Sequence, residues 1–110
     1  MDTSMYDLSG KVAIITGSTR GIGNAIAKLM AQNGAAVVIT GRKQEACDKV
    51  AAEITAEGGK AIGVATSVDD PASRENLVKT TVEKLGRIDI LVNNAGVGGT
   101  PKNMLEDRKS

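Results

Sequence analysis

The residues that point most clearly to a chemical role are three closely spaced glycines, Gly17, Gly21 and Gly23. An aliphatic run precedes them and a segment of helical spacing follows, as expected for a turn between a strand and a helix. Glycine permits a sharp turn and close approach of a ligand to the backbone, and free N–H groups at the start of a helix attract anions. The spacing therefore predicts a turn that binds the pyrophosphate of a dinucleotide.

Other interpretations of this turn are less favourable. A Walker loop would require Gly-Lys-Ser/Thr, which does not follow, and the spacing is Gly-x-x-x-Gly-x-Gly rather than Gly-x-Gly-x-x-Gly. The glycines could instead serve only the packing of a helix on a strand. We favour dinucleotide binding because a predicted strand precedes the turn and a predicted helix follows it.

Two arginines bear on which dinucleotide is bound. A carboxylate about 20 residues past the glycine turn normally binds the ribose 2′-hydroxyl and selects NAD. That window ends near Lys43 without an acidic residue, and the next acid, Glu45, lies inside a predicted helix. Arg42 could bind a 2′-phosphate, and Arg20 could reach the same group from the glycine turn. The sequence predicts NADP(H) over NAD(H), unless both arginines are merely solvated surface charges.

Composition excludes several classes of function. The chain has 110 residues, no histidine and one cysteine, Cys47, so the common zinc sets, an internal disulfide and Ser-His-Asp or Cys-His catalysis are excluded. We assign Cys47 no role and predict no metal site. The net charge of +1 offers no electrostatic footprint for nucleic acid or an anionic membrane surface. No apolar run approaches the length of a membrane span, so we expect a cytoplasmic protein.

The elements that must position these residues alternate along the chain. Short aliphatic runs alternate with segments of helical spacing, the pattern of βα units in a parallel sheet. Predicted strands span 12–16, 36–40, 61–66 and 88–93. Predicted helices span about 21–33 and 43–57, and a third begins at Pro71 after the cap Asp70. Gly34, Gly58 and Gly86 are the predicted helix ends.

Each predicted helix carries an apolar stripe that should face the sheet. The stripe residues are Ile22, Ile26, Leu29 and Met30 in the first helix, Ala46, Val50 and Ile54 in the second, and Leu77, Val78, Thr81, Val82 and Leu85 in the third. The predicted fold is therefore α/β, a partial Rossmann-type doubly wound parallel sheet with strand order 3-2-1-4. Its fourth strand would be an uncovered apolar edge, through which we expect the chain to self-associate.

Two motifs together resemble the short-chain dehydrogenase/reductase family. They are Thr16-Gly17-x-x-x-Gly21-x-Gly23 in the first βα turn and Asn93-Asn94-Ala95-Gly96 at the end of the fourth strand. The resemblance covers about residues 8–96. It implies that Asn94, Ala95 and Gly96 lie beside the adenosine and pyrophosphate side of the cofactor. Where many relatives have an Asp that holds the adenine, this chain has Ser67.

The resemblance and the glycine turn together give a set of expected cofactor-binding residues. They are Gly17, Ser18, Arg20, Gly21, Ile22, Gly23, Arg42, Ser67, Val68, Asn94, Ala95 and Gly96. The resemblance also implies hydride transfer between the nicotinamide and a small carbonyl or alcohol substrate, with a Tyr as acid or base and a Lys four residues later. The sequence has only Tyr6, with Gly10 four residues on, so we assign no catalytic residue and expect this chain alone to be inactive.

The sequence thus predicts a cofactor-binding half-domain over 1–96 and an irregular charged tail over 97–110, which we expect to be a truncation point. The leading hypothesis is an NADP(H)-dependent oxidoreductase present as its cofactor-binding half. The alternative is a non-catalytic nucleotide-binding or interaction module. A related epimerase or dehydratase of extended type fits less well, because those proteins tend toward a Gly-x-x-Gly-x-x-Gly turn.

Overall fold

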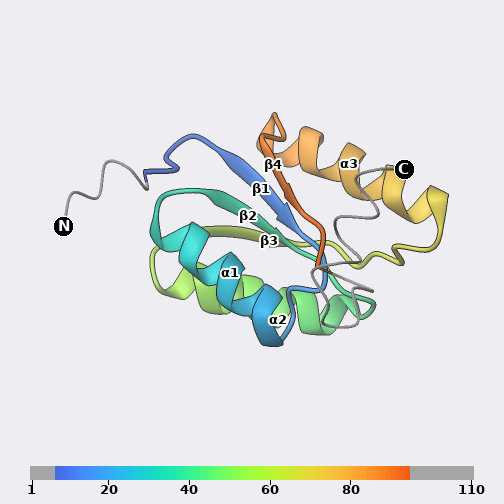
Figure 1. The fold of residues 1–110 in the computed structure, drawn as a ribbon, viewed down its shortest axis with the longest axis horizontal. Helices are drawn as coiled ribbons and strands as arrows, with labels where there is room; N and C mark the ends of the chain where they lie inside the picture. Colours follow the sequence, from blue (N-terminus) through green and yellow to red (C-terminus); the bar gives the residue numbers. More distant parts are fainter. Residues whose placement is uncertain (1–6, 95–110) are drawn as a thin grey trace.

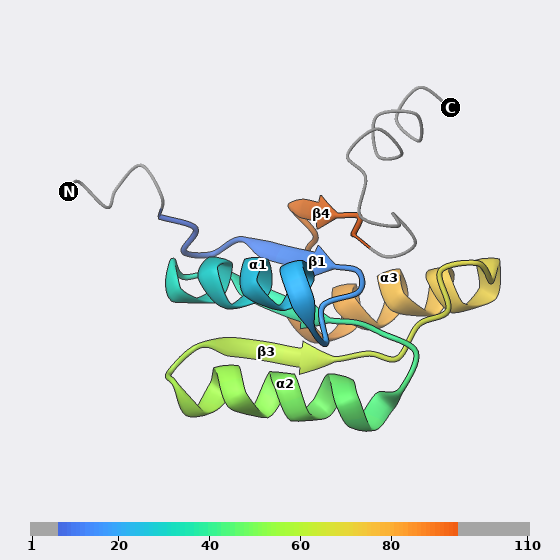
Figure 2. The ribbon, with the colours of Figure 1, turned by 60° about the horizontal axis from the view of Figure 1, so that its bottom comes forward.

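The computed structural model describes residues 7–94, which form a four-stranded parallel sheet flanked by three helices (Figures 1 and 2). The elements in chain order are β1 (Val12–Ile15), α1 (Gly21–Gln32), β2 (Ala36–Ile39), α2 (Gln44–Ala56), β3 (Lys60–Gly63), α3 (Pro71–Leu85) and β4 (Ile90–Val92). All neighbouring strands are parallel, in the order β3-β2-β1-β4. The predicted Rossmann-type fold and strand order are confirmed.

The helices divide between the two faces of the sheet, so the core has two parts. Successive strand residues point to opposite faces, and in β1 this places Ile15 on one side and Ile14 on the other. Ile15 belongs to the larger core, which α1 and α2 cover. Ile14 packs with Leu77 of α3 on the opposite face. Figure 1 shows α1 and α2 together on one side of the sheet, with α3 on the other.

The boundaries of α3 follow from local sequence. The Asp70 carboxylate accepts a hydrogen bond from the Ala72 N–H at 3.0 Å, and Pro71 occupies the first turn, where a missing N–H costs nothing. Gly86 ends the helix in the left-handed conformation, with φ of 84°. The predicted cap and the predicted helix end are both confirmed.

The apolar stripe predicted for α1 is partly wrong. Ile22 and Leu29 are 70% and 60% exposed, although Ile26 and Met30 pack against the core as expected. The helix instead buries a stripe of small residues, Gly23, Ala27 and Ala31. Small side chains let the helix backbone lie close to the sheet, which turns the larger residues of the predicted stripe outward.

The stripe of α3 and the strand lengths also need correction. In α3, Leu77 and Thr81 are buried, whereas Val78 and Val82 are about half exposed. All four strands are shorter than predicted, because each predicted run includes residues outside the parallel ladder. β3 ends at Gly63, so the segment after it, including the buried Thr66, is a loop rather than strand.

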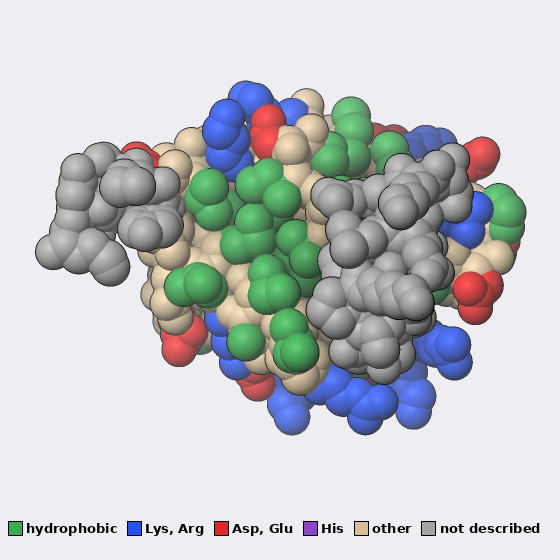
Figure 3. All heavy atoms as spheres, viewed as in Figure 1, with side chains coloured by type: hydrophobic (Ala, Val, Ile, Leu, Met, Phe, Trp, Pro, Cys, Tyr) green, Lys and Arg blue, Asp and Glu red, His purple; other side chains and the backbone are tan. Residues whose placement is uncertain are grey.

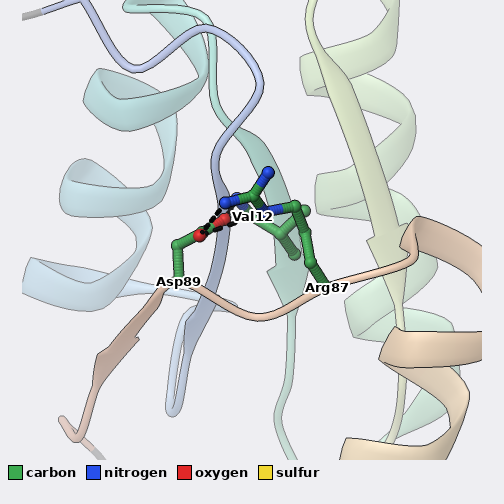
Figure 4. Close-up of polar contacts among 3 residues, drawn as sticks. All are labelled: Val12, Arg87 and Asp89. Atoms are coloured by element: carbon green, nitrogen blue, oxygen red, sulfur yellow. Dashed lines mark hydrogen bonds and ion pairs between the residues drawn. The ribbon is translucent and has the colours of Figure 1, made fainter.

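β4 is an edge strand, held to β1 by side-chain as well as backbone contacts. The Asp89 carboxylate, just before β4, accepts from the Val12 N–H at 2.8 Å and pairs with the Arg87 guanidinium at 2.7 Å (Figure 4). In the middle of β4, Leu91 is 64% exposed. With Val78 and Leu77 it lines a hollow of about 550 Å³ on the α3 face.

Hydrophobic side chains also reach the surface on the opposite face. In Figure 3 they form a band over β1 and α1, in the view that looks onto α1 and α2. The exposed Ile22 and Leu29 of α1 lie on this side of the sheet. Within residues 7–94, no helix is long and apolar enough to cross a membrane.

Candidate functional site

The carboxyl ends of the parallel strands meet at one edge of the sheet, where open α/β folds bind their ligands. A pocket of about 600 Å³ lies there, between the turn after β1, the loop after β2 and the loop after β3. Its lining residues are Gly17, Thr19, Arg20, Thr40, Gly41, Arg42, Lys43, Ala46, Thr66, Val68 and Asp69. The fold therefore brings the predicted glycine turn and both predicted arginines to one site.

The glycine turn packs so tightly that position 23 excludes any side chain. A Cβ atom at Gly23 would lie 2.4 Å from the Gly17 carbonyl oxygen and 2.8 Å from Nδ2 of Asn94. Gly21, in contrast, faces open space and has φ of +66°. In the described part of the chain, no side chain caps the N-terminus of α1, and its first turn carries no acid. The helix start can therefore accept an anionic group.

Ser18 lies under the turn rather than on its surface. Its side chain is fully buried, and its Oγ accepts a hydrogen bond from the Thr40 N–H at 2.9 Å. The Ser18 N–H donates to the Thr40 carbonyl, also at 2.9 Å. Ser18, predicted from the sequence to bind cofactor, thus has a hydroxyl that joins the glycine turn to the end of β2.

Asn94 closes the other side of the turn. Its backbone N–H donates to Oγ1 of Thr16 at 2.7 Å, and its side-chain amide donates to the Gly17 carbonyl at 3.3 Å. The Thr16 hydroxyl also bonds Oδ1 of Asn93 at 3.2 Å, so the ends of β1 and β4 are held together. The structure places Asn94 against the glycine turn, and its contact with a cofactor stays a prediction. The predicted residues Ala95 and Gly96 lie outside the described residues.

The pocket is basic on two sides. Arg20 contributes from the glycine turn and Arg42 from the loop after β2, and both side chains are exposed to solvent. Lys43 adds a third cation that the sequence analysis did not single out, although it directly follows Arg42. Figure 3 shows Lys and Arg side chains gathered near the end of the sheet where α2 begins. Among the described lining residues, Asp69 is the one acid.

The loop after β3 forms the third wall. Thr66, Val68 and Asp69 line the pocket, while the Ser67 side chain between them is exposed. The Ser67 N–H donates to Oγ of Ser73 at 2.8 Å, which fixes the loop to the first turn of α3. Val68 was predicted from the sequence, but Thr66 and Asp69 were missed because no motif marked them.

Two further sequence predictions concern α1 and α2. Ile22, expected to bind cofactor, lies in the first turn of α1 with its side chain in solvent. Cys47 is buried in α2, with Sγ 3.8 Å from the Gly41 carbonyl. Burial raises the pKa of the Cys47 thiol above its usual range. The thiol therefore remains protonated near neutral pH and is a poor nucleophile.

Several known proteins are similar to this chain in sequence. The family model described as short chain dehydrogenase matches residues 11–109. An uncharacterized oxidoreductase of Methylorubrum extorquens is 49% identical over 84% of this chain and 38% of its own. Tropinone reductase-like 3 of Erythroxylum coca is 45% identical over 92% of this chain and 39% of its own.

A solved structure is also similar to this chain, in both fold and sequence. A hydroxysteroid dehydrogenase from Escherichia coli superposes with a TM-score of 0.82 and 38% identity, over 94% of this chain and 46% of that chain. The chain thus spans about two fifths of the length of the curated relatives that it matches. The glycine turn, the sheet order and the match over residues 11–109 agree, and the chain belongs to the short chain dehydrogenase family of oxidoreductases.

Proposed function

We propose that this chain is the cofactor-binding part of an NADP(H)-dependent oxidoreductase. The observation that carries the proposal is the pocket beside the glycine turn, into which Arg20, Arg42 and Lys43 bring positive charge from two different loops. A 2′-phosphate bears negative charge that an NAD ribose lacks, so cations at this position favour the phosphorylated cofactor.

The end of β2 supports the same preference. A carboxylate there would accept hydrogen bonds from the ribose hydroxyls and repel a phosphate. Gly41 follows Thr40 at this point, and Arg42 comes next. The one acid of the described lining, Asp69, lies on the opposite wall, in the loop after β3.

The proposed pyrophosphate site is the start of α1. The N–H groups of its first turn are free of side-chain caps in the described residues, and Gly21 and Gly23 leave room for a close approach. The proposed binding set is Gly17, Ser18, Arg20, Gly21, Ile22, Gly23, Arg42, Ser67, Val68, Asn94, Ala95 and Gly96. Within it, Ser18 contributes by holding the glycine turn to the end of β2, because both its backbone N–H and its hydroxyl bond Thr40.

We propose that the complete protein transfers a hydride between this cofactor and a small carbonyl or alcohol substrate. The bound nicotinamide would supply or accept the hydride. The names of two relatives, tropinone reductase-like 3 and a hydroxysteroid dehydrogenase, support this reaction class. The sequence has no Tyr-x-x-x-Lys, so we expect no turnover from these 110 residues alone.

The missing Tyr-x-x-x-Lys also favours a second candidate, a nucleotide-binding module without catalysis. The two candidates share the cofactor site and differ in turnover by the whole protein. The half-domain boundary at residue 96 and the cytoplasmic location stay predictions, which limited proteolysis and cell fractionation would check.

Titration of the chain with NADPH and with NADH, followed by the fluorescence of the reduced nicotinamide, tests the cofactor proposal. We expect NADPH to bind more tightly, and Arg42→Glu to weaken NADPH binding by about tenfold to a hundredfold with little effect on NADH. Lys79→Glu makes the same charge change on α3, outside the pocket, and should leave both affinities unchanged. Equal losses for both nucleotides in Arg42→Glu would contradict a contact with the 2′-phosphate.

A further inference from the structure

We infer that Gln44 is a positioning residue that sets the separation between two walls of the cofactor pocket. This inference rests on the proposed function. Gln44 is the first residue of α2 and directly follows Arg42 and Lys43 of the basic wall. Its carboxamide reaches across to the loop after β3, whose continuation carries Val68 and Asp69 of the opposite wall.

The contacts of Gln44 use both ends of its carboxamide. Nε2 donates to the Gly63 carbonyl at 2.8 Å and to Oδ1 of Asp48 at 2.7 Å, and Oε1 accepts from the Ala65 N–H at 2.9 Å. A carbonyl and an N–H two residues apart on one side of a strand are what a neighbouring strand would bind. The Gln44 side chain therefore binds the outer edge of β3, in the place where a neighbouring strand would bind in a larger sheet; within residues 7–94 no strand lies there.

The opposite side of the same segment is held by backbone. The Val64 N–H donates to the Ile39 carbonyl at 2.9 Å, and the Thr66 N–H donates to the Gly41 carbonyl at 2.8 Å. The segment therefore lies between the end of β2 and the Gln44 side chain. Without Gln44, the Gly63 carbonyl and the Ala65 N–H would bond water, and the segment that leads to Val68 would lose its link to α2. The bonds of Thr66 to Gly41 and of Ser67 to Ser73 would remain, so we expect a partial rather than a complete loosening of this side of the pocket.

The chemistry of the contacts requires an amide at this position. A glutamate could still accept from the Ala65 N–H, but it could not donate to the Gly63 carbonyl, and its charge would face the Asp48 carboxylate. A leucine of similar size would make neither bond. Glutamate is nevertheless favourable in the first turn of a helix, so Gln44→Glu should keep α2 folded while it breaks the link to β3.

The experiment measures the dissociation constants of NADPH and NADH for the 110-residue chain and for Gln44→Leu, Gln44→Glu and Gln32→Leu. Gln32 is an exposed glutamine of α1, so its change controls for the loss of a surface amide. We expect both Gln44 variants to weaken NADPH and NADH by the same factor, about threefold to tenfold. The NADPH to NADH ratio should stay at the wild-type value, and Gln32→Leu should change neither constant.

Amide hydrogen exchange at Ala65 gives a second readout that needs no nucleotide. We expect faster exchange in both Gln44 variants. If the wild type binds NADPH and the folded Gln44 variants bind both nucleotides with unchanged affinity, the positioning role is overturned. If the variants lose affinity for NADPH alone, Gln44 acts directly on the 2′-phosphate and the positioning role is overturned as well. Failure of the wild type to bind either nucleotide would overturn the proposed function and this role with it, while faster Ala65 exchange would still show that Gln44 holds the loop.

Discussion

Asp89 and Val12 exchange two hydrogen bonds, one through a side chain and one through the backbone. The Val12 N–H donates to the Asp89 carboxylate at 2.8 Å, and the Asp89 N–H donates to the Val12 carbonyl at 2.9 Å. Arg87 adds two further bonds to the same carboxylate, from Nε and Nη2. The start of the edge strand β4 is therefore fixed to the start of β1 by a charged group.

This arrangement predicts a pH-dependent stability. The bonds from Arg87 and then from Val12 hold the pKa of the Asp89 carboxyl below its ordinary value. A lowered pKa stabilises the fold above the unfolded value of about 3.9, and this contribution is lost as the pH falls through the lowered pKa. Asp89→Asn should lower the Tm at pH 7, and the difference from wild type should narrow below about pH 4.

Thermal unfolding followed by circular dichroism between pH 7 and pH 2 measures this effect. Glu75→Gln, which removes an exposed carboxylate of α3, controls for the loss of one negative charge. A constant difference in Tm between Asp89→Asn and wild type across the whole pH range would show that the carboxylate charge is not responsible.

Gly23→Ala should destabilise the chain, although the same change inside an ordinary helix stabilises it by about 1 kcal/mol. The reason is the 2.4 Å separation between the added Cβ and the Gly17 carbonyl oxygen, a backbone atom that can move only if the turn moves. We expect a loss of about 1–3 kcal/mol in the free energy of unfolding and weaker binding of both nucleotides. Denaturation in urea and nucleotide titration measure the two effects, and a more stable variant would refute the close packing.

Ser18→Ala tests whether the Ser18 hydroxyl stabilises the fold rather than binding a ligand. Removal of the buried Oγ leaves the Thr40 N–H without its partner, which costs about 1–3 kcal/mol. Ser67→Ala, at an exposed hydroxyl, should change stability by less than about 0.5 kcal/mol. Urea denaturation of both variants measures the contrast. Equal stabilities would mean that the Ser18 hydroxyl does not hold the turn to β2.

Leu91→Lys should reduce self-association of the chain. Leu91 is 64% exposed in β4, and within residues 7–94 no strand pairs with the outer edge of β4. An apolar side chain on such an edge invites pairing with a second copy. A lysine on the edge opposes such pairing by charge. Sedimentation velocity over a range of concentrations measures the effect, with Leu29→Lys, an exposed leucine of α1, as the control. A monomeric wild type at all concentrations would rule out association through β4.

The sequence predicted most of the fold because its signals are local. The glycine spacing marks the turn after β1, and Asp70 with Pro71 marks the start of α3. The stripe of α1 was misassigned because large and small residues both repeat at helical spacing. Only tertiary packing decides that Ala27 faces the sheet while Leu29 faces solvent.

Parts of the site depend on contacts between distant residues and therefore escaped the sequence analysis. The bond from Gln44 to Gly63 joins positions 19 residues apart, and it depends on where β3 ends. The inward turn of the Ser18 hydroxyl depends likewise on Thr40, 22 residues later. Neither contact leaves a pattern in the order of residues, because glutamine and serine are common in loops of every kind.

Thr19 of the glycine turn lies against Gly41 of the loop after β2. A Cβ atom at Gly41 would lie 2.9 Å from Cγ2 of Thr19. The most direct redesign toward an unphosphorylated ribose, an aspartate at position 41, would therefore collide with a stiff β-branched neighbour. A change of cofactor preference in this chain therefore requires two substitutions together, a smaller residue at position 19 and a larger one at position 41.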